Sequence, residues 1–280
     1  MDSSEIQAAL RPRFGELELS TAERDGFRAV LISPPAGGNW SNSDRSQLRD
    51  AFVALGIRRG IMPNVETFSG RVAGEAEASE LMTLGDARSF IRFIRPCEGG
   101  PLDRAGFGLV VTLGGCMLIV ARGDGQWLMA CHAGFRSLAD IDALGGATPR
   151  RFESVVDSIA YESERRYGIR AGEIDLECFF GLMPGALIYH YERNGAYKRY
   201  VESLVSRWGK ATAWETDAEE GRAVVVDPGA IFLAQAHGAG FRSATRSCDI
   251  TADGPFANTR HTVESLAGER RNLGVILRTG

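Results

Sequence analysis

Residues 106–134 read GFGLVVTLGGCMLIVARGDGQWLMACHAG, and this stretch decides how the rest of the chain is interpreted. Two apolar, β-branched runs of strand length are separated by Gly114-Gly115. Gly-Asp-Gly at 123–125 is a strong signal for a tight hairpin turn, and the residues after it are again typical of a strand. We therefore expect a hairpin whose open end brings Cys116 close to His132.

Outside this hairpin, strand and helix patterns follow one another without strict βαβ alternation. Ser43 or Asp44 can cap a helix that runs through 48–56, and helical spacing of apolar residues predicts a helix over 151–167, stopped by Gly168. We also expect strands at 27–33, 174–182, 222–226 and 272–278, and a helix at 228–240. This mixture favours an α+β fold with mixed sheets over a doubly wound parallel sheet. It also predicts an N-terminal extension over 1–26 and one domain over 27–280.

The bulk composition is that of an ordinary globular protein, with 280 residues of which 44% are apolar and 24% charged. A net charge of -4 and a pI near 5.7 give no general attraction to nucleic acid or to anionic lipid. The first residues lack the apolar core of a signal peptide, and no run reaches the roughly 18 apolar residues of a membrane span. The five cysteines include no CxxC pair, so we expect reduced thiols and a cytoplasmic protein without nucleic-acid or membrane partners.

The residues of the hairpin that could carry chemistry are Cys116 and His132. The glycine pair before Cys116 allows a tight turn, which would place the amide N–H of Gly115 near the sulfur as an oxyanion hole. An imidazole within hydrogen-bond reach would lower the pKa of the thiol and produce a nucleophilic thiolate. The alternative is a buried structural cysteine with a hydrogen-bonded structural histidine, since both residue types are commonly buried for packing alone.

The string Cys131-His132-Ala133-Gly134-Phe135-Arg136-Ser137-Leu138 resembles the HAGWRGL-type signature of the YfiH-like family, also called laccase-domain proteins. Cys116 falls where the ADC cysteine of that family lies. Weaker matches are found in the loop and helix at 39–56 and in the C-terminal elements at 256–260 and 268–272, so that the resemblance covers most of 27–278 in order. It implies one domain in which two mixed sheets pack as a sandwich with helices outside, an αββα arrangement.

The sequence departs from the family at its zinc site. The family has a QxHG histidine upstream of the cysteine, whereas residues 65–70 here read VETFSG. A catalytic zinc usually needs three protein ligands, so Cys116 and His132 alone leave the set incomplete. If zinc is present, His190 is the first candidate for the third ligand. Gln235-Ala-His237-Gly238 matches QxHG literally, but it lies at the end of a predicted helix in the wrong part of the chain.

The cysteine loop Thr112-Leu-Gly-Gly-Cys116 resembles a related set of proteins instead. That set comprises the cytotoxic necrotizing factor catalytic domain, a Burkholderia lethal factor and the chemoreceptor glutamine deamidase, with LSGC and GSC loops. Its members share the broad fold and use cysteine with histidine, without metal, to deamidate protein glutamine.

Three functions stay open at this point. The first is a metal-independent Cys–His hydrolase that cleaves a C–N bond without a cofactor, in a small molecule or in a protein glutamine. The second, implied by the resemblance, is a zinc-dependent purine nucleoside phosphorylase or adenosine deaminase, and the third is a non-catalytic binding module. The missing upstream histidine favours the first. Arg136 and Arg260 could bind a phosphate or carboxylate group, with solvated surface arginines as the alternative.

Overall fold

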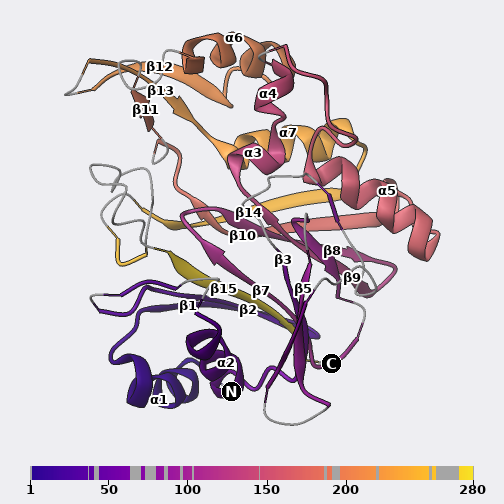
Figure 1. Cartoon of the computed structure of the whole chain (residues 1–280). Coiled ribbons are helices and arrows are strands. Elements are labelled where there is room, and N and C mark those ends of the chain that lie inside the picture. Colours follow the sequence, from indigo (N-terminus) through magenta and orange to yellow (C-terminus); the bar gives the residue numbers. More distant parts are fainter. Residues whose placement is uncertain are drawn as a thin grey trace.

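The protein is a layered α+β structure (Figure 1). The computed structural model describes the chain except for residues 1, 37, 41–43, 64–70, 73–79, 85–87, 95–96, 103, 145, 186–187, 191–195, 219–220, 252–253, 257–270 and 280. Two mixed sheets stack face to face, with helices on the outer face of each and a small third sheet beyond the second helical layer. The predicted fold class is therefore confirmed.

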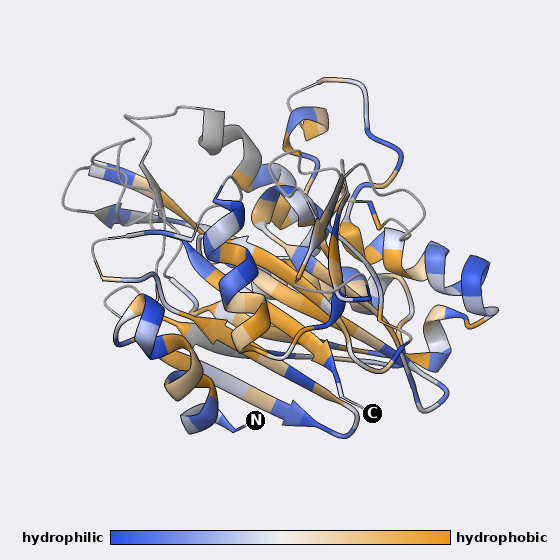
Figure 2. Ribbon diagram, turned by 60° about the horizontal axis from the view of Figure 1, so that its bottom comes forward, coloured by the Kyte–Doolittle hydropathy of each residue, from blue (hydrophilic) through white to orange (hydrophobic). Residues whose placement is uncertain are grey.

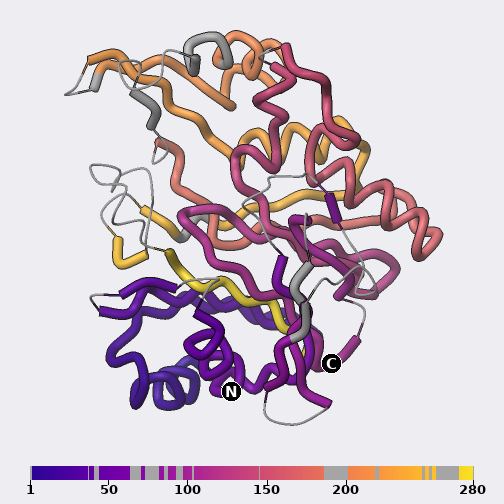
Figure 3. The backbone as a smooth tube through the Cα atoms, in the orientation of Figure 1, coloured from indigo at the N-terminus to yellow at the C-terminus, as the bar shows by residue number. Residues whose placement is uncertain are grey.

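The larger sheet has seven strands in the order β1-β2-β15-β7-β3-β5-β4. Its pairs are antiparallel except for β3, which is parallel to both β5 and β7. The C-terminal strand β15 lies between strands from the first half of the chain (Figure 3). The strands are β1 (Leu19–Arg24), β2 (Phe27–Ile32), β3 (Arg59–Pro63), β4 (Glu80–Thr83), β5 (Phe90–Ile94), β7 (Phe107–Leu113) and β15 (Asn272–Arg278).

The second sheet has five strands in the order β14-β10-β8-β9-β6. Its centre is the predicted hairpin, and only β10 and β14 are parallel. The strands are β6 (Gly99–Pro101), β8 (Met117–Gly123), β9 (Gln126–Ala133), β10 (Ile174–Leu182) and β14 (Ser243–Ile250). The small antiparallel sheet contains β11 (Ile188–His190), β12 (Ala213–Ala218) and β13 (Gly221–Val226).

Helices cover the two outer faces of the stacked sheets. The N-terminal helices α1 (Ser3–Phe14) and α2 (Arg45–Ala54) pack on the seven-stranded sheet, and α5 (Val155–Tyr167) and α7 (Pro228–Gly238) pack on the five-stranded one. The other helical elements among the described residues are α3 (Phe135–Leu138), α4 (Ile141–Leu144), the short helix Ala171–Glu173 and α6 (Ala196–Trp208). No helix in the described part of the chain is long and apolar enough to cross a bilayer.

The alternation of side chains along the strands explains the layers. In β2, Ala29 and Leu31 belong to the core between the sheets, whereas Val30 and Ile32 belong to the core under α1 and α2. Successive strand residues point to opposite faces, so a strand that is apolar at every position must be covered on both sides. Apolar residues accordingly concentrate in the central strands (Figure 2).

The expected elements are present, with two differences in detail. The helix predicted over 151–167 begins only at Val155, because the side chains of Ser154 and Asp157 form a capping box that fixes its start. The segment expected as an extension over 1–26 contains α1 and β1, which add a helix and an edge strand to the seven-stranded layer.

Candidate active site

The site lies at the open end of the β8–β9 hairpin. Its turn has left-handed backbone at Asp124 (φ 49°) and Gly125 (φ 72°), as a type I′ turn requires. The strands pair Leu118 with His132 and Met117 with Ala133. Cys116, one residue beyond, therefore faces Gly134, and its side chain lies on the same face of the sheet as His132.

Gly134 leaves the room in which Cys116 and His132 meet. A Cβ atom at this position would lie 3.0 Å from Sγ of Cys116 and 3.1 Å from Cε1 of His132. The two side chains thus border the same space across the diagonal of the pairing, and a hydrogen bond between Cys116 and His132 joins them. The contact expected from the hairpin is present, because the residue opposite Cys116 has no side chain to separate the pair.

A buried carboxylate completes the chain of polar groups. Nδ1 of His132 lies 2.8 Å from Oε2 of Glu98, and the two side chains are 1% and 0% exposed. Glu98 is fixed by the backbone, because its carbonyl accepts a 2.7 Å hydrogen bond from the amide of His132 just before β6 begins. The hydroxyl of Ser137, also buried, donates to the same Oε2 at 3.0 Å. Cys116, His132 and Glu98 therefore form one hydrogen-bonded series.

The electrostatics of this series favour a protonated imidazole. Burial alone would lower the pKa of His132, but the negative charge of Cys116, its hydrogen bond and Glu98 together raise that pKa from 6.5 to about 10. At neutral pH, Nδ1–H then donates to Glu98, and the second ring nitrogen faces the sulfur. A cationic imidazole beside a thiol stabilises the thiolate. The arrangement thus supports a thiolate–imidazolium pair.

The neighbouring strand β10 leaves β8 just before Cys116. Its last pair with β8 joins Phe179 to Leu118, and the next residue, Phe180, has a left-handed φ of 61°. A bulky residue rarely adopts this conformation, and here it coincides with a register shift between β10 and β14. The pairing between β8 and β10 therefore ends before Cys116 is reached, although β10 still pairs with β14 as far as Leu182.

The other residues named from the sequence are placed as follows. Gly115 has a φ of 95°, a left-handed value that glycine adopts at little cost, directly before Cys116. Arg136 is exposed and pairs with Asp142 at 3.0 Å. Arg260 lies outside the described residues, and so does the side chain of His190, although its backbone is part of β11.

The remaining described cysteines differ from Cys116 in burial. Cys97, Cys131 and Cys178 are buried, whereas Cys116 is partly exposed, and none of the four forms a disulfide. Burial and the charge of Glu98 raise the pKa of Cys97 to about 12, and burial also raises the pKa of Cys131 well above its ordinary value. The environments of these two buried cysteines therefore disfavour the thiolate form.

The described residues supply only part of a ligand set for the zinc that the family resemblance implies. Cys116 and His132 supply one sulfur and one ring nitrogen, and Glu98 is already bound to Nδ1 of His132. Among the side chains that the structure describes, no three of His, Cys, Asp or Glu converge as a metal site. Two donors fall short of the three that a catalytic zinc needs, so the described residues do not fit the ion.

Sequence reasoning missed Glu98 and the contact made by Ser137. Glu98 comes from the segment Cys97-Glu98-Gly99, which has no strand periodicity, and its backbone pairing depends on a distant strand. Ser137 lies inside the string that resembles the family signature, but its type alone does not indicate a contact with a carboxylate. A glutamate within an apolar and glycine-rich stretch is the one signal that could have been used.

Comparison with known proteins finds similarity at the level of structure. No family model matches the chain, and no curated protein matches it in sequence. YlmD from Geobacillus stearothermophilus is 15% identical over 91% of this chain and 93% of its own, with a TM-score of 0.59. The Neisseria meningitidis protein NMB0706, of family DUF152, is 13% identical over 94% and 99%, with a TM-score of 0.57. The Bacillus licheniformis hypothetical protein YfiH is 11% identical over 90% and 93%, with a TM-score of 0.54. The chain therefore has the fold of the YfiH-like proteins.

Proposed function

We propose that the protein is a metal-independent cysteine hydrolase that cleaves a C–N bond. Cys116 is the nucleophile, His132 the general base and acid, and Glu98 the carboxylate that holds His132. The observation that carries the proposal is the hydrogen-bonded series from the partly exposed Cys116 through the buried His132 to the buried Glu98. Nucleophile, base and orienting acid in this order are the constellation that activates a thiol for attack on a carbonyl carbon.

The reaction follows from these positions. The Cys116 thiolate attacks the amide carbon, and the oxyanion that forms is received by the turn amides at Gly115 and Cys116. The His132 imidazolium gives its proton to the departing nitrogen, which leaves a thioester on Cys116. Neutral His132 then takes a proton from water, the resulting hydroxide attacks the thioester, and the carboxylic acid product leaves with the thiolate restored. Glu98 keeps Nδ1 of His132 engaged throughout.

The substrate class that fits this chemistry is a small amide or the side-chain amide of a protein glutamine. No cofactor takes part in these steps. Arg136 and Arg260 are proposed to bind an anionic group of the substrate, although Arg136 must first give up Asp142. Thiols kept reduced suit a cytoplasmic enzyme without nucleic-acid or membrane partners.

A zinc-dependent nucleoside phosphorylase or deaminase is the second candidate. One observation favours it: a carboxylate on the far nitrogen of a histidine is also the usual support of a zinc-bound imidazole. It requires a third ligand such as His190. A binding module on the same fold is the third candidate and predicts no reactivity of Cys116.

Ammonia release from primary amides, including glutamine side chains of a denatured protein, tests the proposal. The protein is treated with a chelator and compared with the variant Cys116→Ser. Turnover that survives the chelator and disappears in Cys116→Ser is the expected result. Phosphorolysis or deamination of purine nucleosides that requires about one zinc per chain would replace the proposal with the second candidate.

A further inference from the structure

The one-turn helix α3 connects the site to a second polar network. It follows Gly134 directly, and its Ser137 donates to the Glu98 carboxylate at 3.0 Å. A helix of four residues is not stable by itself, because the free-energy cost of nucleating a helix exceeds the gain from the hydrogen bonds of a single turn. The position of Ser137 therefore depends on whatever satisfies the last carbonyls of α3.

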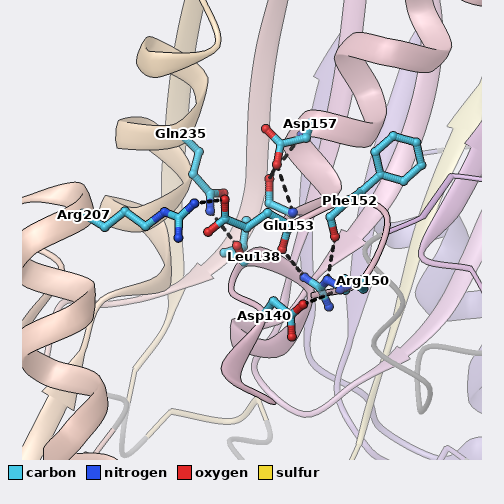
Figure 4. Close-up of polar contacts among 9 residues, drawn as sticks. Leu138, Asp140, Arg150, Phe152, Glu153, Asp157, Arg207 and Gln235 are labelled. Atoms are coloured by element: carbon cyan, nitrogen blue, oxygen red, sulfur yellow. Dashed lines mark hydrogen bonds and ion pairs between the residues drawn. The ribbon is translucent and has the colours of Figure 1, made fainter. Parts of the chain in front are cut away.

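Side chains from outside the helix bind these carbonyls, and Figure 4 shows one of the contacts, that of Gln235 with Leu138. Arg150 donates from Nη1 to the carbonyl of Arg136 at 2.8 Å and from Nη2 to that of Ser137 at 3.1 Å. Gln235 of α7 donates to the carbonyl of Leu138 at 2.5 Å. Three successive carbonyls at the end of α3 are thus held by two side chains.

Arg150 also binds the chain on its other side. Its Nε donates to the carbonyl of Phe152 at 2.7 Å, and Nη2 also donates to that of Glu153. The planar guanidinium thus ties α3 to the segment that leads into α5, a geometry that the single ammonium of lysine cannot span. The backbone amide of Arg150 is itself fixed by Asp140 at 2.9 Å.

The charge of Arg150 is retained in this setting. Burial lowers its pKa, but the charges of Asp140, Glu98 and Glu153 oppose that effect. The guanidinium is consequently a cation whose five donors are directed mainly at backbone carbonyls. The planar arrangement of these donors, together with Gln235, holds the carbonyls at the end of α3.

We propose that Arg150 is a positioning residue of the Cys116–His132–Glu98 site and acts through Ser137. The inference rests on the proposed function. Without the guanidinium of Arg150, the end of α3 loses two of its hydrogen-bond donors and frays. Ser137 then moves away from Oε2 of Glu98, and the carboxylate turns away from Nδ1 of His132. A buried imidazolium that loses its acceptor is disfavoured, so its proton returns to the thiol and the pKa of Cys116 rises.

The test measures the pH dependence of Cys116 alkylation by iodoacetamide in the full chain. The variants are Arg150→Met, Arg150→Lys and Ser137→Ala. Arg151→Met is the matched control, because Arg151 is the exposed neighbour whose guanidinium lies over the rings of Phe152 and Tyr161. Thermal unfolding is recorded for each variant, so that a loss of stability is separated from a change in the thiol.

We expect Arg150→Met, Arg150→Lys and Ser137→Ala to raise the alkylation midpoint by about one pH unit, or to slow the reaction roughly tenfold below that midpoint. Arg151→Met should match the wild type. A wild-type profile in Ser137→Ala overturns the proposal even if Arg150→Met does not fold, and so does a wild-type profile in Arg150→Lys. A wild-type Cys116 that titrates as an ordinary thiol would instead defeat the proposed function itself.

Discussion

Two charged clusters lie along the β8–β9 hairpin, and of these two only the one at its open end is buried. At the open end, His132 and Glu98 are 1% and 0% exposed and lie 2.8 Å apart. Beside Val120, in the middle of β8, Arg24 and Glu177 pair with side-chain exposures of 46% and 24%. That pair borders a shallow cavity of about 280 Å³, lined also by Asp25, Val120, Arg122, Trp127, Asp175, Leu176, Ser243 and Thr245.

The difference shows what a buried charge requires. Water screens the exposed pair, and its loss is tolerated because each partner can be solvated. The side chain of His132 is 1% exposed, so solvent cannot substitute for Glu98 or Cys116, and each group depends on the others for its protonation state. Interactions of this kind change the pKa of a nucleophile, whereas surface pairs do not.

Replacing the histidine at the buried end should produce the largest effect. In His132→Ala the Glu98 carboxylate loses its cation while it stays buried, so we expect the free energy of unfolding to fall by about 3–5 kcal/mol. Urea denaturation measures this loss. A change in the free energy of unfolding below roughly 1 kcal/mol would show that the interaction of His132 with Glu98 stabilises the protein no more than a surface ion pair does.

The same interaction should depend on pH. The pKa of His132 is raised from 6.5 in the unfolded reference to about 10. A raised folded-state pKa stabilises the protein fully below the unfolded value, and this contribution is lost as the pH rises through the folded value. The difference in melting temperature between the wild type and His132→Gln should therefore shrink between pH 6.5 and about 10. A constant difference over that window would contradict the assignment.

Separating the two side chains without removing either gives a smaller effect. Gly134→Ala places a methyl group 3.0 Å from Sγ of Cys116 and 3.1 Å from Cε1 of His132. Overpacking of this kind costs about 1–3 kcal/mol, and we expect Cys116 alkylation to slow with it. Gly172→Ala is the control, since its Cβ would meet nothing closer than 3.7 Å. Equal alkylation rates in the two variants would show that the contact across Gly134 is not needed.

The smallest effect is expected at the exposed pair of Arg24 and Glu177. Glu177→Gln removes the partner of Arg24, and the free energy of unfolding should change by less than about 1 kcal/mol. Alkylation of Cys116 should remain at the wild-type rate. A slower reaction in this variant would mean that the exposed pair is coupled to the site through β10 and β8.

The sequence predicted the hairpin and the pairing of its ends because turn chemistry and strand periodicity are local. The strand β6 escaped prediction, since Gly99–Pro101 looks like a loop. It is a strand because its backbone approaches β9 so closely that a Cβ at Gly99 would lie 2.1 Å from the carbonyl oxygen of Ala130. That approach is a tertiary contact, and it is also what brings Glu98 to His132.

The contacts of Arg150 and Gln235 with α3 could not be predicted from the sequence either. In the sequence, Gln235 stands out only as part of a match to the QxHG pattern, whereas in the structure its side chain donates a hydrogen bond to the carbonyl of Leu138. Arg150 carries no motif, and its partners are backbone carbonyls, which have no sequence signature. Contacts between side chains and distant backbone atoms depend on the fold, so residue types alone could not predict them.

The pH dependence of Cys116 alkylation in the wild type and in Glu98→Gln tests the central claim most directly. The measurement follows the pH midpoint of Cys116 rather than its rate relative to Cys97, Cys131 and Cys178, because burial by itself would protect those three thiols from the reagent. We expect a wild-type midpoint well below the value of about 8.5 for a free thiol, and a shift toward that value in Glu98→Gln, which keeps the shape of the side chain but not its charge. A wild-type midpoint near 8.5 that Glu98→Gln leaves unchanged would contradict the account.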